Sequence, residues 1–593
     1  MIGKSVTGIV VLSAQFVVWQ IGMMAISTRN AQGAEREPPA LLVNALGYLA
    51  DAPKTVVSRT NGEFRVLNAA GEVVHRGQLQ KAADGLGQWF VGDFTQVKTD
   101  GEYRIESGDE RSRPFAIGAA AEAKYRQALR AAATWFGKGR ANCSDDPKKP
   151  ALWMNDGVRS DNGQPQDFVG GWQDTGVDQR KFVITNAAGV WALLHARANH
   201  AAMWKDAPDW LLAEIRWGSD WLHKMQDPQG YLYYGIDRKG KGGQTWPDPK
   251  SGEARKVWVD RHSLAVHFWF IAGQAWLARE LAKDDDAYAA KCLGAARRCL
   301  SYCREHFEEM NHADRIAVDP VRRIRNPESD MRMDVLDDYA LGIAAGLELH
   351  RATKEKEHFD FAVDMARRFM ALQVKDSPAD AGGIYGFFYQ DDARAAFYVP
   401  KISMHVPMLA LCDLIEANPN HADAGAWRGC LKRYVEGFLI PLADRSAFGI
   451  VPYGVWKGEF ANPRRQVGQM YFRYFKGRPE FKFSSGRWAV ESTTAAGLAR
   501  AARVLNQPAW RNLAWRQVDW VMGVNPLGKM PYGISPVADA KKKSPPIAET
   551  VAVPNGICGD EQDMPIWGIW PAAETWIPNN AGLLAALSEL LKQ

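Results

Sequence analysis

Two segments of the chain, about 400 residues apart, carry carboxylates beside tryptophans. Asp174 and Asp178 stand in a glycine- and tryptophan-rich loop that begins at Gly170, and Glu574 stands just before the apolar stretch 577–591. A pair of carboxyl groups, one acting as acid and one as base, is the equipment for cleaving a glycosidic bond. An acidic residue just before a helix also stabilises the helix end, so helix capping is the alternative role for Glu574.

Five other side chains are candidate sugar contacts because they stand in polar loops or beside an expected helix start. An indole or phenol ring offers a flat apolar face with a polar edge, which suits a sugar ring. Packing against the loop backbone is the alternative for the aromatic residues, and helix capping for the basic ones. The candidates are Trp172, Tyr453, Trp456, Arg261 and His262.

An acidic run, residues 559–563, could hold a structural calcium ion through the oxygens of Asp560, Glu561 and Asp563. Its spacing lacks the EF-hand pattern, so a solvated loop is the alternative. Hydrolysis by two carboxyl groups needs no cofactor, and we expect none.

Composition excludes several function classes. The 593 residues carry 73 basic and 68 acidic side chains, a net charge of +5, and the longest lysine run is residues 541–543, so nothing indicates a nucleic-acid partner. The seven cysteines show no paired zinc-binding spacing. Cys292, Cys299 and Cys303 have helical spacing, which favours buried thiols.

The first 34 residues read as an export signal. Lys4 precedes an apolar stretch from Val6 to Ile26, and cleavage is expected after Ala34. We therefore expect a secreted or periplasmic protein, with an uncleaved amino-terminal anchor as the alternative.

Residues 37–118 are predicted to form a small β-sandwich, because short β-rich runs alternate with turn residues. The expected strands lie near residues 41–43, 55–57, 63–66, 72–75, 89–91 and 101–105.

Residues 119–593 are predicted to be helical, because apolar positions there recur with helical spacing between long loops. About twelve helices are expected, with no strands between them, and this number suggests six antiparallel hairpins closed into an (α/α)6 barrel. In such a ring all even-numbered helices start at one rim. The Asp174/Asp178 loop precedes the second helix and Glu574 the twelfth, so the carboxylates should share that rim. The expected helix starts are near residues 121, 186, 208, 263, 287, 334, 357, 407, 425, 492, 508 and 580.

Nearly the whole chain after the signal resembles family 9 of the glycoside hydrolases, the cellulase family, in the branch with an immunoglobulin-like amino-terminal domain. The motifs that carry the resemblance occur in the family's order. They are Asn44-Ala-Leu-Gly47-Tyr48, Gly101-Glu-Tyr103, Gly170-Gly171-Trp172-x-Asp174 with Lys181-Phe182, Trp221-Leu222-x-Lys224-Met225-Gln226, Asp338-Tyr-Ala340, Gly523-Val-Asn525-Pro526 and Glu574-x-x-Ile577-x-x-Asn580-Ala581.

The chain departs from the family pattern at two places. The family's loop aspartates stand three residues apart, whereas Asp174 and Asp178 stand four apart. The family's Pro-His-His-Arg run is missing, since no histidine follows His421. A sugar-binding subsite must therefore differ from the family's.

The resemblance implies an inverting hydrolase of β-1,4-linked glycans, similar to an endoglucanase. Glu574 would be the general acid, Asp178 the base, and Asp174 a second ligand of the attacking water. The substrate would be a β-linked polysaccharide or oligosaccharide. The alternatives are a polysaccharide lyase, because α/α toroids also host β-elimination, and a catalytically silent glycan-binding protein.

Overall fold

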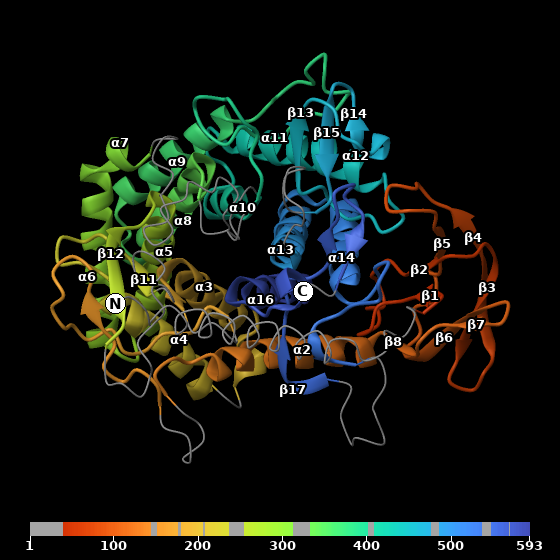
Figure 1. Cartoon of the computed structure of the whole chain (residues 1–593), viewed down its shortest axis with the longest axis horizontal. Helices are drawn as coiled ribbons and strands as arrows, with labels where there is room; N and C mark the ends of the chain where they lie inside the picture. Colours follow the sequence, from red (N-terminus) through yellow and green to blue (C-terminus); the bar gives the residue numbers. More distant parts are fainter. Residues whose placement is uncertain are drawn as a thin grey trace, which may run out of the picture.

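A computed structural model describes residues 39–143, 151–175, 180–205, 208–236, 254–311, 333–400, 408–475, 486–535, 547–567 and 570–592. The predicted signal segment and Asp178 lie outside these ranges. Figure 1 shows a β-rich domain (red) at one end of a larger helical domain. The predicted fold class, a β-sandwich followed by a helical barrel, is confirmed.

The β-rich domain contains all six predicted strands and two more. Its strands are β1 (Leu41–Leu42), β2 (Thr55–Ser58), β3 (Gly62–Asn68), β4 (Val73–Lys81), β5 (Phe90–Asp93), β6 (Gly101–Ser107), β7 (Glu110–Arg111) and β8 (Phe115–Ile117). They pair in the order β1-β2-β5-β4-β3-β6-β7, with β8 on β6. Strand β4 links the two layers, since it pairs with β3 over most of its length and with β5 only at Gln80 and Lys81.

Alternation along the first strands divides their side chains between two cores. Leu41 and Val56 belong to the small core inside the sandwich, while Leu42 and Val57 belong to the core of the helical domain. Successive side chains of a strand point to opposite faces. One face of the β1–β2 pair is therefore buried against the helices, and the two domains share a continuous apolar contact.

Among the described residues, twelve long helices form two concentric rings, in agreement with the predicted number of about twelve. The inner helices are α3 (Val183–Asn199), α5 (Leu264–Leu281), α8 (Val335–Thr353), α10 (Met408–Ala417), α13 (Trp488–Leu505) and α16 (Ile577–Leu590). Each inner helix packs on the next, and α16 packs on α3, which closes the ring. The outer helices are α2 (Ala119–Lys138), α4 (Pro208–Lys224), α6 (Asp286–Glu305), α9 (Lys356–Ala371), α11 (Ala424–Tyr434) and α14 (Pro508–Val521).

Sequence pattern explains which helices are inside. All 14 residues of α16 are buried, whereas α9 buries only one stripe. A helix that is apolar on every side must be covered all round, while an amphipathic helix can face water.

Polar contacts show that the inner helices run parallel. At their starts, the Ala265 N–H of α5 donates to Asp338 of α8. At their ends, Nε2 of His200, just after α3, lies 2.9 Å from the backbone oxygen of Ser588 in α16. All inner helices therefore begin at one rim, which we call the starting rim, and finish at the opposite, closed end.

Short strands occur between the helices, so the prediction of strand-free loops is wrong. A few residues of extended chain carry no alternating pattern long enough to detect. These strands are β9 (Val158–Arg159), β10 (Lys181–Phe182), β11 (Tyr233–Ile236), β12 (Lys256–Arg261), β13 (Gly454–Lys457), β14 (Gln466–Val467), β15 (Met470–Arg473), β16 (Tyr532–Ile534), β17 (Ile547–Ala552), β18 (Cys558–Gly559) and β19 (Pro565–Ile566). The short helical pieces are η1 (Ala201–Trp204), α7 (Phe307–Met310), η3 (Val435–Leu439), α12 (Ile440–Ala443), η4 (Pro463–Arg465) and α15 (Trp570–Ala573).

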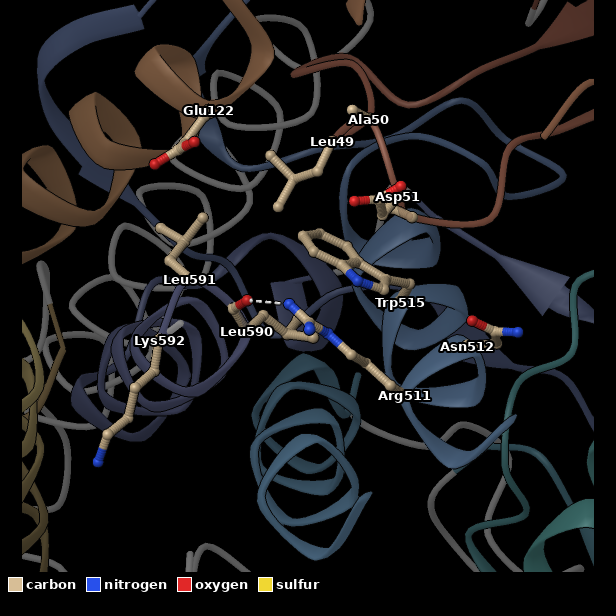
Figure 2. A pocket seen from close by; sticks show the side chains of 11 residues that line it. Leu49, Ala50, Asp51, Glu122, Arg511, Asn512, Trp515, Leu590, Leu591 and Lys592 are labelled. Carbon is tan, nitrogen blue, oxygen red and sulfur yellow. Dashed lines mark hydrogen bonds between the residues drawn. The ribbon is translucent and has the colours of Figure 1, made fainter. Parts of the chain in front are cut away.

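The β-rich domain packs along α14, and its Ala45 N–H donates to the backbone oxygen of Met522, just after the end of that helix, over 3.0 Å. A cavity of about 300 Å³ lies between its loop at Leu49–Ala52, Trp515 of α14 and the last turn of α16 (Figure 2). There Arg511 donates to the Leu590 oxygen over 2.8 Å. A cation at a helix carboxyl end offsets the negative end of the helix dipole. The cavity is thus a structural junction on the side away from the starting rim.

Within the described ranges, no helix combines the length and the apolar character that crossing a bilayer requires. The buried positions of Cys292, Cys299 and Cys303 confirm their predicted role as core thiols.

Candidate active site at the starting rim

The two carboxylate-bearing segments lie side by side at the starting rim. The Ile577 N–H, at the start of α16, donates to the backbone oxygen of Asp174 over 3.0 Å. Thr175 and Trp576 form an antiparallel bridge. The prediction that the segments of Asp174 and Glu574 meet at one end of the barrel is therefore confirmed, and ring closure through α16 is the reason.

Backbone hydrogen bonds fix the main chain at both carboxylate residues. The Asp174 N–H donates to the backbone oxygen of Arg180 over 2.8 Å, and the Asn555 N–H donates to the backbone oxygen of Glu574 over 2.8 Å. Asp174 is buried, with 4% of its surface exposed, whereas Glu574 is half-buried. A half-buried carboxyl group can reach a bound ligand and still feel an apolar surrounding, which a general acid needs.

Glycine is required where the loop turns toward Asp174. Gly171 has a φ of +72°, and a Cβ atom there would lie 2.6 Å from the Trp221 ring. The Trp217 Nε1–H donates to the Gly171 oxygen over 2.8 Å. The indoles of α4 therefore pack directly against the loop backbone, and only a residue without a side chain leaves room for them.

Trp172 lies beneath this loop and is completely buried, so its predicted role as a sugar contact is wrong. Its Nε1–H donates to Glu214 over 2.6 Å, and its ring meets Phe136 edge to face. Glu214 also pairs with Arg140, at 2.9 Å. Trp172 holds the loop from inside the barrel and cannot face a ligand.

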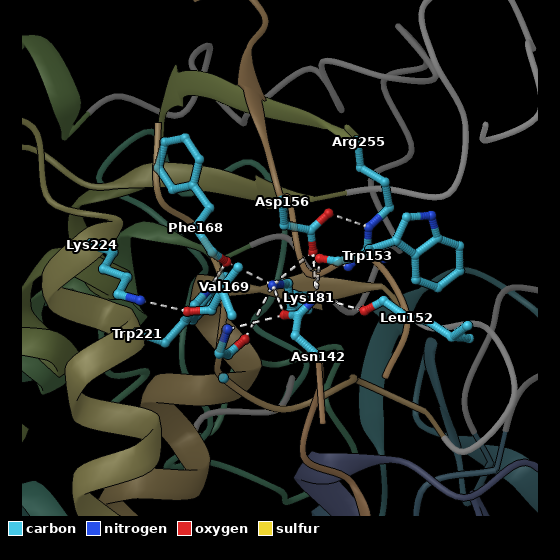
Figure 3. A network of polar contacts seen from close by, with 12 residues as sticks. Asn142, Leu152, Trp153, Asp156, Phe168, Val169, Lys181, Trp221, Lys224 and Arg255 are labelled. Atoms are coloured by element: carbon cyan, nitrogen blue, oxygen red, sulfur yellow. Dashed lines mark hydrogen bonds and ion pairs between the residues drawn. The ribbon is translucent and has the colours of Figure 1, made fainter. Parts of the chain in front are cut away.

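A buried polar network stands behind the loop (Figure 3). Lys181 Nζ lies 3.1 Å from Asp156, and Asp156 also pairs with Arg255. Burial raises the pKa of Asp156, but Lys181 and Arg255 outweigh that effect and lower it overall. Burial lowers the pKa of Lys181 to about 7 although Asp156 opposes the shift. Only the motif Lys181-Phe182 hinted at this network, because Asp156 and Arg255 lie 99 residues apart.

Two further predicted sugar contacts are buried, so those predictions are wrong. Tyr453 is 2% exposed and has the Arg487 guanidinium 5.7 Å from its ring centre. His262 is 3% exposed and stacks on Tyr234, and burial, with a smaller contribution from His267, lowers its pKa to about 3. His262 is therefore a neutral core residue.

Trp456 and Arg261 are partly exposed, and their contact with sugar stays a prediction. Trp456 stacks on Tyr471 at a centroid distance of 5.5 Å. Arg261 donates to the Tyr302 hydroxyl over 2.9 Å and pairs with Glu309. Its guanidinium is thus directed toward α6 and α7.

The acidic run 559–563 does not form the predicted calcium site. Asp563 is fully buried, and its two oxygens accept hydrogen bonds from four donors: Arg465 Nε, Arg473 Nε and the N–H groups of Tyr474 and Phe475. Asp560 accepts from the N–H groups of Gln562 and Met564, and Glu561 is exposed. With its oxygens used in this way, Asp563 anchors the loop to β15 and has no free lone pair aimed at a cation.

Comparison with known proteins agrees with this arrangement. Residues 125–535 match the model of glycosyl hydrolase family 9, and residues 36–112 match the cellulase N-terminal ig-like domain. A cellodextrinase of Butyrivibrio fibrisolvens is 23% identical over 369 residues, which cover 58% of this chain and 64%, less than two thirds, of that protein.

Solved structures show the same fold. A GH9 protein of Bacteroides ovatus has a TM-score of 0.66 and 18% identity, and the match covers 93% of this chain and 99% of that one. AaCel9A, solved in complex with cellobiose-like isofagomine, has a TM-score of 0.61 and 18% identity over 93% of this chain and all of that one. Since one family model spans residues 125–535, more than half of the sequence, the chain belongs to glycosyl hydrolase family 9.

Proposed function

We propose that this protein is an inverting glycoside hydrolase that cleaves β-1,4-linked glucans or their oligosaccharides. The observation that carries the proposal is the pairing of the Asp174 loop with the segment of Glu574 at the starting rim. It joins a buried carboxylate to a half-buried one from opposite ends of the catalytic domain, as a two-carboxylate mechanism requires.

Each carboxylate has a separate task. Glu574 protonates the oxygen of the leaving sugar, which it can reach because its side chain is only half-buried. Asp178 takes a proton from the attacking water, and Asp174 orients the same water. An inverting mechanism places acid and base about 6.5–9.5 Å apart so that this water fits between base and sugar. Asp178 lies outside the described residues, so its role rests on the family resemblance.

The substrate class follows from the family and from similar proteins. A cellodextrinase and a complex with a cellobiose-like inhibitor both indicate β-linked glucose units. The missing Pro-His-His-Arg run predicts a subsite that differs from the family's, so short and substituted β-glucans belong among the test substrates. The signal-like residues 1–34 support action outside the cytoplasm, on glycans in the periplasm or medium.

The decisive experiment follows the anomer that is released first. The purified protein is incubated with cellohexaose, mixed-linkage β-glucan, xylan, mannan and chitosan, and the best substrate is followed by proton NMR in the first minutes, before mutarotation. A single displacement turns a β-linkage into an α-hemiacetal, so the α-anomer should appear first. An initial β-anomer would indicate a covalent intermediate, and an unsaturated uronate signal would indicate a lyase. Binding without any product would leave a glycan-binding protein.

A further inference from the structure

The loop that leads to Asp174 is held by its carbonyl groups. Four consecutive carbonyls, those of residues 168–171, each accept a hydrogen bond from a side chain. Phe168 accepts from Trp221, Val169 from Lys224 and Gly171 from Trp217. Lys181 donates to Phe168 and Gly170 over 2.8 and 3.1 Å. These bonds fix the backbone three residues before Asp174.

Of the two lysines among these anchors, Lys181 is the fully buried one, and all its protons are used. Its ammonium group donates to the Phe168 and Gly170 oxygens and to Asn142 Oδ1 over 2.8 Å, and Asp156 lies 3.1 Å away. Asn142 Oδ1 in turn accepts from the Gly170 N–H over 3.0 Å. An ammonium group has three N–H donors and no acceptor, so it matches this set of oxygens.

The charges around Lys181 do not balance. Asp156 is shared between Lys181 and Arg255, so the buried group carries one negative and two positive charges. On α4, Lys224 adds another positive charge, although it is paired with Asp167 at 2.9 Å, and the Trp221 ring centre lies 5.5 Å from Lys181 Nζ. Removing one proton from Lys181 would leave a neutral Asp156–Arg255 pair.

We propose that Lys181 is a positioning residue: its ammonium group holds the 168–174 loop, and thereby Asp174, in the arrangement needed for catalysis. The inference rests on the proposed function for its catalytic consequence. Its structural part, the hold on the loop, can be tested without any turnover.

The physical basis is the match between the three N–H donors of Lys181 and the oxygens of Phe168, Gly170 and Asn142. A side chain without an ammonium group removes one donor from each of these oxygens in a dry interior, and an unsatisfied buried acceptor is unfavourable.

Linkage gives the sign of any pH effect at Lys181. Between pH of about 7 and 10.5 the unfolded chain binds more protons at Lys181 than the folded chain does. Stability rises with pH wherever the unfolded state binds more protons, so raising the pH across this window does not weaken the fold through Lys181.

The first test is hydrogen exchange of the wild-type protein and of Lys181→Met at one pH. Protection factors for residues 168–175 should be at least about tenfold lower in the variant, while those of α5 stay the same. Unchanged protection of the loop would overturn the proposal whether or not the protein hydrolyses any glycan.

The second test compares Lys181→Met, Lys181→Arg and a matched buried lysine. Lys54, in the β-rich domain, is also fully buried and donates to the Ala50, Ala52 and Thr95 oxygens. Lys181→Met should lower kcat about 10- to 100-fold with a smaller change in KM, since a loop shifted by about 1 Å costs up to about 10²-fold. Lys54→Met should be destabilised but keep the wild-type kcat per folded molecule.

Lys181→Arg keeps the positive charge at all pH values. If it folds, it should restore part of kcat and part of the loop's protection. A Lys181→Met enzyme with wild-type kcat and wild-type loop protection would overturn the proposal.

Discussion

The two ends of the inner helical ring are held together by different kinds of contact. At the starting rim, the segments of Asp174 and Glu574 are joined through backbone groups, by the Ile577 N–H donor and by the Thr175–Trp576 bridge. At the closed end, side chains make the contacts. The carboxylates on the rim can therefore be changed without removing the hydrogen bonds that position them. At the closed end the charged side chains themselves hold the helices together.

The closed end is a cluster of buried ion pairs between neighbouring inner helices. Arg500 of α13 pairs with Asp413 of α10 at 2.6 Å and also with Glu416, and Glu589 of α16 pairs with Arg503 at 2.9 Å. Burial raises the pKa of Glu589, but Arg500 and Arg503 outweigh it and lower the pKa overall. Cations near helix carboxyl ends also offset the helix dipoles.

The largest effect on turnover is expected from Glu574→Gln. The amide has the same shape and cannot donate the proton, so hydrolysis should drop by about 10²-fold or more while binding and the melting temperature stay near wild type. Initial rates on a substrate with an alcohol leaving group, together with thermal unfolding, would measure both. Near wild-type turnover would remove Glu574 from the acid role, and a large loss of stability would show that the rim depends on this side chain.

The next prediction compares substitutions of the two loop aspartates, Asp174 and Asp178. Asp178→Asn should reduce turnover at least as strongly as Asp174→Asn, because Asp178 replaces the family's second aspartate, the proposed base. Both variants should fold, since the hydrogen bonds of Asp174 described above belong to its backbone. Azide, a small nucleophile, should partly restore the base variant and not Glu574→Gln on a natural glycan. The reverse ranking of the two aspartates would assign the base to Asp174.

The smallest effect on turnover, and the largest on stability, is expected from Arg500→Met at the closed end. Removing one partner of a buried ion cluster leaves uncompensated carboxylates, which typically costs about 3–5 kcal/mol in the free energy of unfolding. The kcat per folded molecule should stay within about twofold of wild type.

Denaturant unfolding measures this loss, and Lys356→Met, which breaks an exposed pair with Asp360, is the matched control. The control should change stability by no more than about 0.5 kcal/mol. Because the pKa of Glu589 is lowered in the folded protein, its contribution is present above the unfolded pKa and is lost as the pH falls through the folded pKa. The difference between wild type and Arg500→Met should therefore shrink in acid. A variant as stable as wild type would mean that the ion cluster contributes nothing net.

The sequence alone determined the local elements and the order in which they occur. Alternation along the amino-terminal strands, the helical spacing after residue 119 and the count of twelve helices were enough to predict the sandwich, the ring and the meeting of Asp174 with Glu574. These features follow from periodicity and from the geometry of a closed ring. The same reasoning missed strands of two to six residues, because such short stretches carry no period.

Only the tertiary structure decided which polar and aromatic side chains face a ligand. Trp172 and Tyr453 stand in loops that look exposed, yet the helices packed over those loops bury them. In the sequence Asp563 resembles a metal ligand, but in the structure Arg465 and Arg473, from a separate segment, form ion pairs with its oxygens. Lys181, Asp156 and Arg255 meet because strands β10, β9 and β12 start at the same end of one sheet. The burial and pairing of a side chain depend on its neighbours in the folded protein, and the sequence pattern does not show which residues those are.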